Sequence, residues 1–114
     1  MRVSVLALNS VFDTGLATVL DAFQTANELA ELSGLSSSRF DVTVVGVRKT
    51  VRTSQGLSVP VRPVAKRAPD CVVVPAIGFK MPDALERALA RPDIHDATLV
   101  LRRWADQGAT MTAA

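Results

Sequence analysis

The stretch Cys71-Val72-Val73-Val74 decides the fold, because it is a short run without a charged or hydrogen-bonding side chain. Its three β-branched valines favour a strand. A strand that is apolar on both of its faces is typical of a parallel sheet that is covered on each side. Pro75 follows directly and ends the run. We therefore predict a fully buried strand over 71–74 inside an α/β domain.

Three other stretches are predicted to be strands, at 3–8, 40–47 and 110–113. The first is a short apolar run that starts almost at the first residue, and the second is rich in β-branched residues. Both features favour strands. The third is a run of mostly small residues that follows Gly108. Together with 71–74, these stretches supply the strands of the predicted sheet.

Apolar residues recur at helical spacing in three segments, from Leu16 to Ala30, from Met81 to Ala90 and from Ile94 to Ala105. This spacing predicts three helices. Gly34 and Gly108 follow the first and the last of them and are expected to end these helices. Strands that alternate with helices imply right-handed crossovers and a mostly parallel sheet.

A small hairpin is predicted between the second strand and the buried run. Val51-Arg52-Thr53 and Leu57-Ser58-Val59 flank the turn-forming residues Ser54-Gln55-Gly56. Pro60 and Pro63 follow, and proline cannot donate a hydrogen bond to a neighbouring strand. This piece is therefore expected at an edge of the main sheet or outside it, with a structural or interface role.

The composition indicates a globular domain without a dominant charge. The 114 residues are 48% hydrophobic, and thirteen basic residues against eleven acidic ones give a formal net charge of +2. A chain of this size is one domain or part of one. Basic pairs occur at 48–49, 66–67 and 102–103 without interleaved aromatic residues, and we interpret them as solvated surface. Charge therefore gives no reason to expect nucleic-acid binding.

The compartment is predicted from the single cysteine and from the lack of long apolar runs. Cys71 cannot form an internal disulfide, which is compatible with a reducing compartment. The apolar run at the N-terminus is too short for a signal sequence. No run approaches the roughly 18 apolar residues that a membrane span needs. We predict a soluble, cytoplasmic protein that has no membrane partner.

A candidate pocket lies on the two loops that follow the strands at 3–8 and 71–74. In open α/β sheets, ligands bind beyond the carboxyl ends of the strands. We predict a small-molecule site lined by Asn9, Ser10, Asp13, Ala76, Ile77 and Gly78. Backbone amides of the second loop could form part of an oxyanion hole. The alternative is that both loops are ordinary turns and that Asp13 or Thr14 only caps the first helix.

Cys71 and His95 are the first residues to test for catalysis or metal binding. Cys71 begins a buried apolar strand, where burial disfavours the reactive thiolate. His95 lies beside Asp93 and Asp96, but adjacent helical residues do not face one point. We therefore predict a structural role for Cys71 and a surface or capping role for His95. The residues alone predict no catalytic residue, no metal and no cofactor.

Four stretches resemble, in order, the class I glutamine-amidotransferase-like (ThiJ/PfpI superfamily) domain at the N-terminus of AraC-type transcriptional regulators. Phe12–Ala30, with the sequence FDTGLATVLDAFQTANELA, resembles the first loop and helix of that family. Phe40–Val45 resembles its second strand, and Val51–Leu57 resembles its V-x-T-S-x-G-L hairpin. Pro69–Pro75 resembles its P-D-x-V-V-V-P strand. The resemblance covers nearly the whole chain.

The resemblance implies that 1–114 form a partial domain: a flavodoxin-like three-layer sandwich with a mostly parallel sheet and a small β-hairpin, incomplete at its C-terminus. In the family, the strand that matches 110–114 leads into a sharp turn carrying a cysteine or another small residue. This chain is expected to end before that turn. Gly15 stands where the family often has an acid, and Asp21 falls at a glutamate, although Asp13 could substitute from the loop. Catalysis is therefore not expected.

The function that the resemblance implies is effector sensing and dimerisation in an AraC-type regulator. The partners would be an unidentified small-molecule effector and a second copy of the chain. The helix-turn-helix part is not in this sequence, so direct DNA binding by this chain alone is not expected. A ThiJ/PfpI-family enzyme (a hydratase, a glyoxalase-like or a deglycase-like protein) truncated before its catalytic cysteine is the alternative. A truncated product that only pairs with partners is a third interpretation.

Overall fold

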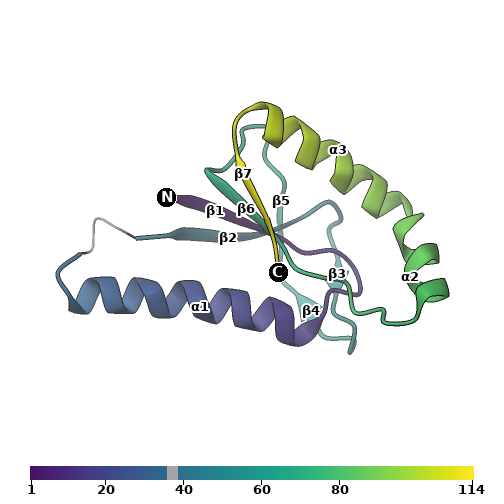
Figure 1. Ribbon diagram of the computed structural model, residues 1–114, viewed down its shortest axis with the longest axis horizontal. Helices are drawn as coiled ribbons and strands as arrows, with labels where there is room; N and C mark the ends of the chain where they lie inside the picture. The colour runs from purple at the N-terminus through teal and green to yellow at the C-terminus, as the bar shows by residue number, and fades with distance from the viewer. Residues whose placement is uncertain (36–38) are drawn as a thin grey trace.

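Five parallel strands form the main sheet in the order β5-β2-β1-β6-β7, so that β1 lies at its centre (Figure 1). The computed structural model describes residues 1–35 and 39–114. The strands of this sheet are β1 (Arg2–Leu6), β2 (Asp41–Gly46), β5 (Arg62–Pro63), β6 (Cys71–Val74) and β7 (Thr110–Ala113). The remaining elements are the antiparallel strands β3 (Val51–Arg52) and β4 (Ser58–Val59) and the helices α1 (Asp13–Leu32), α2 (Pro82–Leu89) and α3 (Pro92–Asp106).

Helices cover both faces of the sheet and complete a three-layer α/β sandwich. α1 runs along one face, and α3 lies on the other with α2 at its start (Figure 1). Val73 of β6 packs in the cluster under α1 with Leu16, whereas Val72 packs in the cluster under α3 with Trp104. Successive side chains of a strand point to opposite faces, so both valines are buried. The predicted α/β fold class and the parallel sheet around 71–74 are confirmed.

Two helices end just before the glycines that the sequence predicts as stop signals. Gly34 and Gly108 have φ angles of +74° and +94°, a left-handed conformation that glycine adopts without steric cost. α1 and α3 end just before these two residues, so the predicted stops are confirmed.

Among the described residues, no helix combines the length and apolar character that crossing a bilayer requires.

The start of α1 differs from the prediction. Phe12 occupies the capping position, and no side chain caps the helix, so the prediction of Asp13 or Thr14 as the cap is wrong. Asp13 instead accepts a hydrogen bond on Oδ1 from the backbone amide of Gln55, at 3.1 Å. The carboxylate is drawn to the β3–β4 turn because that turn packs against the start of the helix.

The prolines after the hairpin mark one edge of the main sheet, as predicted. β5 pairs with β2 over two residues, with Gly46 opposite Pro63. Pro63 has no amide hydrogen, which an edge position tolerates. The predicted hairpin is also confirmed, with Val51 opposite Val59. β5 itself was not predicted as a strand, because two residues are too few to show an alternating pattern.

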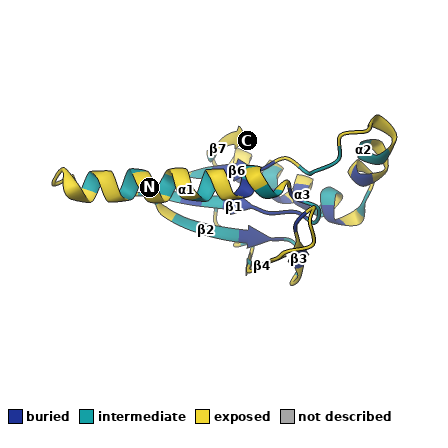
Figure 2. Cartoon of the chain, turned by 90° about the horizontal axis from the view of Figure 1, so that it is seen from below, coloured by how far each residue is buried: buried dark blue, intermediate teal, exposed yellow. Residues whose placement is uncertain are grey.

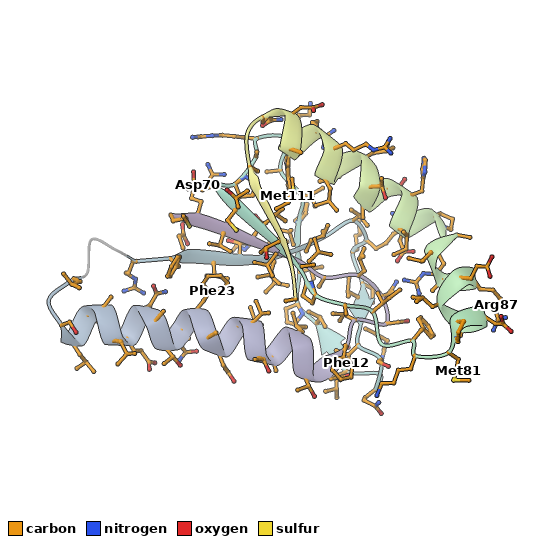
Figure 3. All side chains as sticks on the ribbon, in the orientation of Figure 1. Phe12, Phe23, Asp70, Met81, Arg87 and Met111 are labelled. Atoms are coloured by element: carbon orange, nitrogen blue, oxygen red, sulfur yellow. The ribbon has the colours of Figure 1, made fainter. Side chains whose placement is uncertain are left out.

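β7 forms the other edge of the described sheet. All four of its residues are exposed (Figure 2). Met111 projects from this strand (Figure 3) and stands in register with Val72 of β6. Unlike β5, this strand contains no proline. The amides of Thr110 and Ala114 bond toward β6, so the alternating amides of Met111 and Ala113 face away from it, toward the open edge.

Asn27 attaches α1 to the start of β2. Its Nδ2 donates to the carbonyl oxygen of Phe40 at 2.8 Å, and its Oδ1 accepts from the Phe40 amide at 2.7 Å. The ring of Phe40 also packs edge-on against Phe23 of the same helix, with centroids 5.1 Å apart. One amide side chain thus satisfies both backbone groups of a half-buried residue.

We predict that Asn27→Ala lowers the free energy of unfolding by about 1–3 kcal/mol, because both backbone groups of Phe40 lose their partner. Urea denaturation of the purified chain measures the loss. Gln24→Ala is the matched control on the same helix, since the one side-chain partner of Gln24 among the described residues is Glu28, at an exposed position. Equal effects of the two substitutions would contradict the role assigned to Asn27.

Candidate functional site

The loop after β1 is joined on one side to the β3–β4 hairpin. The amide of Ser10 donates to the carbonyl oxygen of Arg52 at 2.8 Å, and the amide of Ser54 donates to that of Val11 at 2.9 Å. Asn9 Oδ1 accepts from the Arg52 amide at 3.0 Å. The hairpin therefore forms a wall of the site at the carboxyl edge of the sheet.

The same loop is joined on its other side to the loop after β6. The Phe12 amide donates to the carbonyl oxygen of Ala76 at 2.8 Å, and the Gly78 amide donates to that of Ser10 at 2.7 Å. The Ala76 amide donates to the carbonyl oxygen of Ala114 at 2.8 Å. Two of the three amides considered for an oxyanion hole are thus occupied. Of these three amides, only that of Ile77 has no partner among the described residues.

The six residues predicted to line a pocket therefore lie close together, on two loops in direct contact. Val11 is the centre of this contact, because its backbone bridges Thr53 of the hairpin and Ile77 of the second loop. Ser10 takes a left-handed backbone conformation, with φ of 68°, to reach both neighbours. A non-glycine residue in that region is uncommon and is held by its surroundings. The loops form one rigid unit instead of two open turns.

Gly78 is required because the loop after β6 lies close to the β3–β4 hairpin. A Cβ at this position would lie 2.5 Å from Ser54 Oγ and 2.6 Å from Ser54 Cβ. Ser54 Cβ is fixed to the backbone of the hairpin and cannot rotate away. The glycine therefore permits a close backbone approach, and the approaching group is the protein's own hairpin.

Asp13 holds the only buried side-chain oxygen or nitrogen in the described residues that has no hydrogen-bond partner. Its Oδ1 accepts from the Gln55 amide, whereas Oδ2 is buried and accepts nothing. An unsatisfied buried acceptor costs free energy, and a bound donor would recover it. Oδ2 of Asp13 is therefore an unused acceptor that protein atoms cover, so a ligand would bond to it only after a neighbouring group moves aside.

Arg91 is a site residue that sequence reasoning missed. Its guanidinium reaches the carbonyl oxygen of Asn9 at 2.9 Å and Ser10 Oγ at 3.4 Å, and it pairs with Asp93 through Nε at 3.0 Å. The Asp93 side chain is only 9% exposed. Arg91 thereby ties the start of α3 to the loop after β1. No local signal could have revealed it, because its partners in that loop precede it by more than eighty residues.

A hollow of about 570 Å³ opens beside Asn9 at this edge of the sheet. Its lining comes from the loop after β1, the segment after β2 and the start of α3: Asn9, Arg48, Lys49, Thr50, Arg91, Pro92 and Asp93. The size is within the range of roughly 300–1,000 Å³ that small-molecule pockets occupy. The basic pair at 48–49 thus lies beside a hollow.

Cys71 and His95 lie apart from this cluster. Cys71 is half-buried at the first residue of β6, whereas the site begins past the last residue of that strand. His95 is exposed on α3, and the acids on either side of it turn to different cations, Asp93 to Arg91 and Asp96 to Arg48. Across 1–35 and 39–114, no three His, Cys, Asp or Glu side chains form a metal-binding group.

Comparisons with known proteins find similar solved structures but no similar sequence. No protein-family profile matches the sequence, and no curated protein sequence matches it. An AraC-family transcriptional regulator from Pseudomonas putida superposes with a TM-score of 0.73 at 18% identity, over 98% of this chain and 54% of its own. A candidate protease I from Bacteroides thetaiotaomicron gives 0.68 at 21% identity, over 98% and 61%. Oxidized DJ-1 from Toxoplasma gondii gives 0.63 at 21% identity, over 98% and 54%.

These solved structures share the fold of this chain. The predicted resemblance is thereby confirmed at the level of the fold, which is the flavodoxin-like α/β fold of DJ-1 and PfpI-type proteins. The chain spans between half and two thirds of the length of the structures it matches. The same fold is present in proteins described as regulators and as a protease, so the fold alone does not select a function.

We predict that Gly78→Ala lowers the free energy of unfolding by about 1–3 kcal/mol, because the new methyl group overlaps Ser54. Adding Ser54→Gly should recover most of the loss, which a double-mutant cycle by urea denaturation measures. Gly15→Ala is the control, since its Cβ would meet only the Phe12 side chain, no closer than 3.4 Å. Absence of coupling between 78 and 54 would refute the close approach as the cause.

We predict that Arg91→Met lowers the free energy of unfolding by about 1–3 kcal/mol, because the buried Asp93 carboxylate loses its charged partner and the loop carbonyl of Asn9 loses its donor. Arg48→Met is the matched control and should cost less than about 1 kcal/mol, since the Arg48–Asp96 pair is largely exposed. The second substitution Asp93→Asn should restore part of the stability of Arg91→Met. Thermal and urea melts of the four variants test this order.

Proposed function

We propose that this chain is the effector-sensing and dimerisation domain of an AraC-type transcriptional regulator and that it has no catalytic activity. The observation that carries the proposal is the buried, unpartnered Oδ2 of Asp13. It lies at the carboxyl edge of the strands, where open α/β sheets bind their ligands. A ligand N–H or O–H group that reached this oxygen would be recognised by a hydrogen bond to a charged acceptor.

The position of Cys71 supports binding over catalysis. It pairs with Val3 at the amino ends of β6 and β1, and a strand of four residues spans roughly 13 Å. The thiol and the Asp13 carboxylate are therefore at opposite ends of the sheet. Two of the six predicted pocket residues carry a potential nucleophile: Ser10, whose hydroxyl is 3.4 Å from Arg91, and Asp13, whose carboxylate is bonded to the Gln55 amide.

Two of the similar solved structures are described as transcriptional regulators. One is the regulator from Pseudomonas putida, and the other is a candidate regulator from Vibrio parahaemolyticus. The second superposes with a TM-score of 0.63 at 22% identity, over 99% of this chain and 55% of its own. In our proposal the effector binds one of two conformations more tightly and shifts the population between them. DNA contact would belong to another part of the regulator, and a second copy of this domain would be its partner.

Binding of a small molecule at Asp13 can be tested directly on the purified chain. A panel of carboxylates, amines, sugars and aromatic alcohols is screened by thermal shift, and each hit is titrated by calorimetry. We expect Asp13→Ala to weaken binding of a hit at least tenfold, since it removes a charge-assisted hydrogen bond of about 1.5–3 kcal/mol. Asp21→Ala, on the exposed side of α1, is the control. A panel without hits would count against the proposal, whereas hits indifferent to Asp13 would show that the effector binds at another group of this chain.

A ThiJ/PfpI-type enzyme is the second candidate, and the same carboxylate favours it. Enzymes of the superfamily that the sequence resembles carry an acid near the start of the first helix, and Asp13 is the first residue of α1. Turnover of an α-oxoaldehyde or an isocyanide by the purified chain, abolished by Asp13→Ala, would support this function over ligand sensing. We expect no turnover above the buffer rate.

A further inference from the structure

A second hollow adjoins the first and differs from it in chemistry. It measures about 460 Å³ and is lined on its apolar side by Val47, Val61, Val64 and Val100. Arg48 and Lys49 line both hollows, so the two meet at this basic pair. The result is a trough along the α3 side of β2, with an apolar end and a cationic end.

The basic side chains that line the trough differ in how many of their donors are free to bind a ligand. Arg91 is bound to Asp93 and to the loop after β1, so its role is to position that loop. Arg48 uses Nη1 for the carbonyl oxygen of Val47 and for Asp96, at 2.9 and 2.8 Å. Its other two nitrogens, like the ammonium group of Lys49, have no partner among the described residues.

The pair between Arg48 and Asp96 can be exchanged. The two side chains are 39% and 47% exposed, and ion pairs at such exposure contribute little stability. A carboxylate that enters the trough can therefore replace Asp96 on the guanidinium at small cost, and it would gain the neighbouring Lys49. Arginine suits this exchange, because its planar donors match a carboxylate.

We propose that the effector is a small organic anion, a carboxylate with an aliphatic body, whose charge binds Arg48 and Lys49 and whose body lies against the four valines of the second hollow. The inference deepens the proposed function, on which it rests, and places the effector in the trough instead of at Asp13. A free phosphate is disfavoured, because it has no apolar body to lie against the four valines of the second hollow. Only an anion with an apolar body uses both ends of the trough.

Calorimetric titration with butanoate, hexanoate and octanoate tests the proposal, with the matched primary amides and inorganic phosphate as comparison ligands. Affinity should rise with chain length, and the amides should bind at least tenfold more weakly. Arg48→Gln should weaken hexanoate binding at least tenfold. Asp96→Asn should strengthen it several-fold, because it removes the competing carboxylate. Arg67→Gln is the control, a basic residue that lines neither hollow.

A variant at the apolar end, Val64→Asp, should also abolish binding, and its fold is checked by circular dichroism. Carboxylate binding that persists unchanged in Arg48→Gln and Val64→Asp, or that Asp96→Asn does not strengthen, would overturn the inference. If another compound of the wider panel binds through Asp13 while the carboxylates do not bind, the proposed function stands and this inference fails. If no compound binds at all, both fail.

Discussion

The central position of β1 is the constraint on which the rest of the structure depends. It pairs with β2 on one side and with β6 on the other, and Val3, Val5 and Leu6 are buried almost completely. The chain that leaves this strand therefore emerges between two neighbouring strands. It has to bond with the segments that leave both of those strands, since a buried backbone group without a partner is costly. Val11 meets this requirement by bridging the hairpin and the loop after β6.

This constraint shapes the chemistry that the site can offer. Most backbone groups of the loops are used to hold the loops together, so little of the polar backbone remains for a ligand. Recognition then falls to side chains that the contact leaves unsatisfied, of which Asp13 is the buried one. It also falls to hollows beside the loops, where the segment after β2 brings Arg48 and Lys49 next to valines. In our proposal, a ligand held there would bind one conformation of these walls more tightly than the other.

The solved structures that share this fold include regulators, a candidate protease and DJ-1. A single scaffold serves these proteins because the sheet and its helices fix only where a site lies, whereas the side chains on the loops fix its chemistry. In this chain the thiol of Cys71 lies at the amino end of β6 and the carboxylate of Asp13 lies at the other end. That separation is the physical basis for favouring binding over catalysis.

The sequence by itself determined four of the five strands of the main sheet and its three helices, because their signals are local, whereas the two-residue strand β5 carries no such signal. The apolar run at 71–74, the helical spacing after Leu16 and the stop at Gly108 each act within a few residues. Only the tertiary structure decided the contents of the site. Arg91 meets Asn9 across more than eighty residues, and Asp13 meets Gln55 across forty-two, so the local sequence around either residue gives no sign of its partner. The start of α1 was mispredicted for the same reason, since a distant amide took the carboxylate that local propensity assigned to the cap.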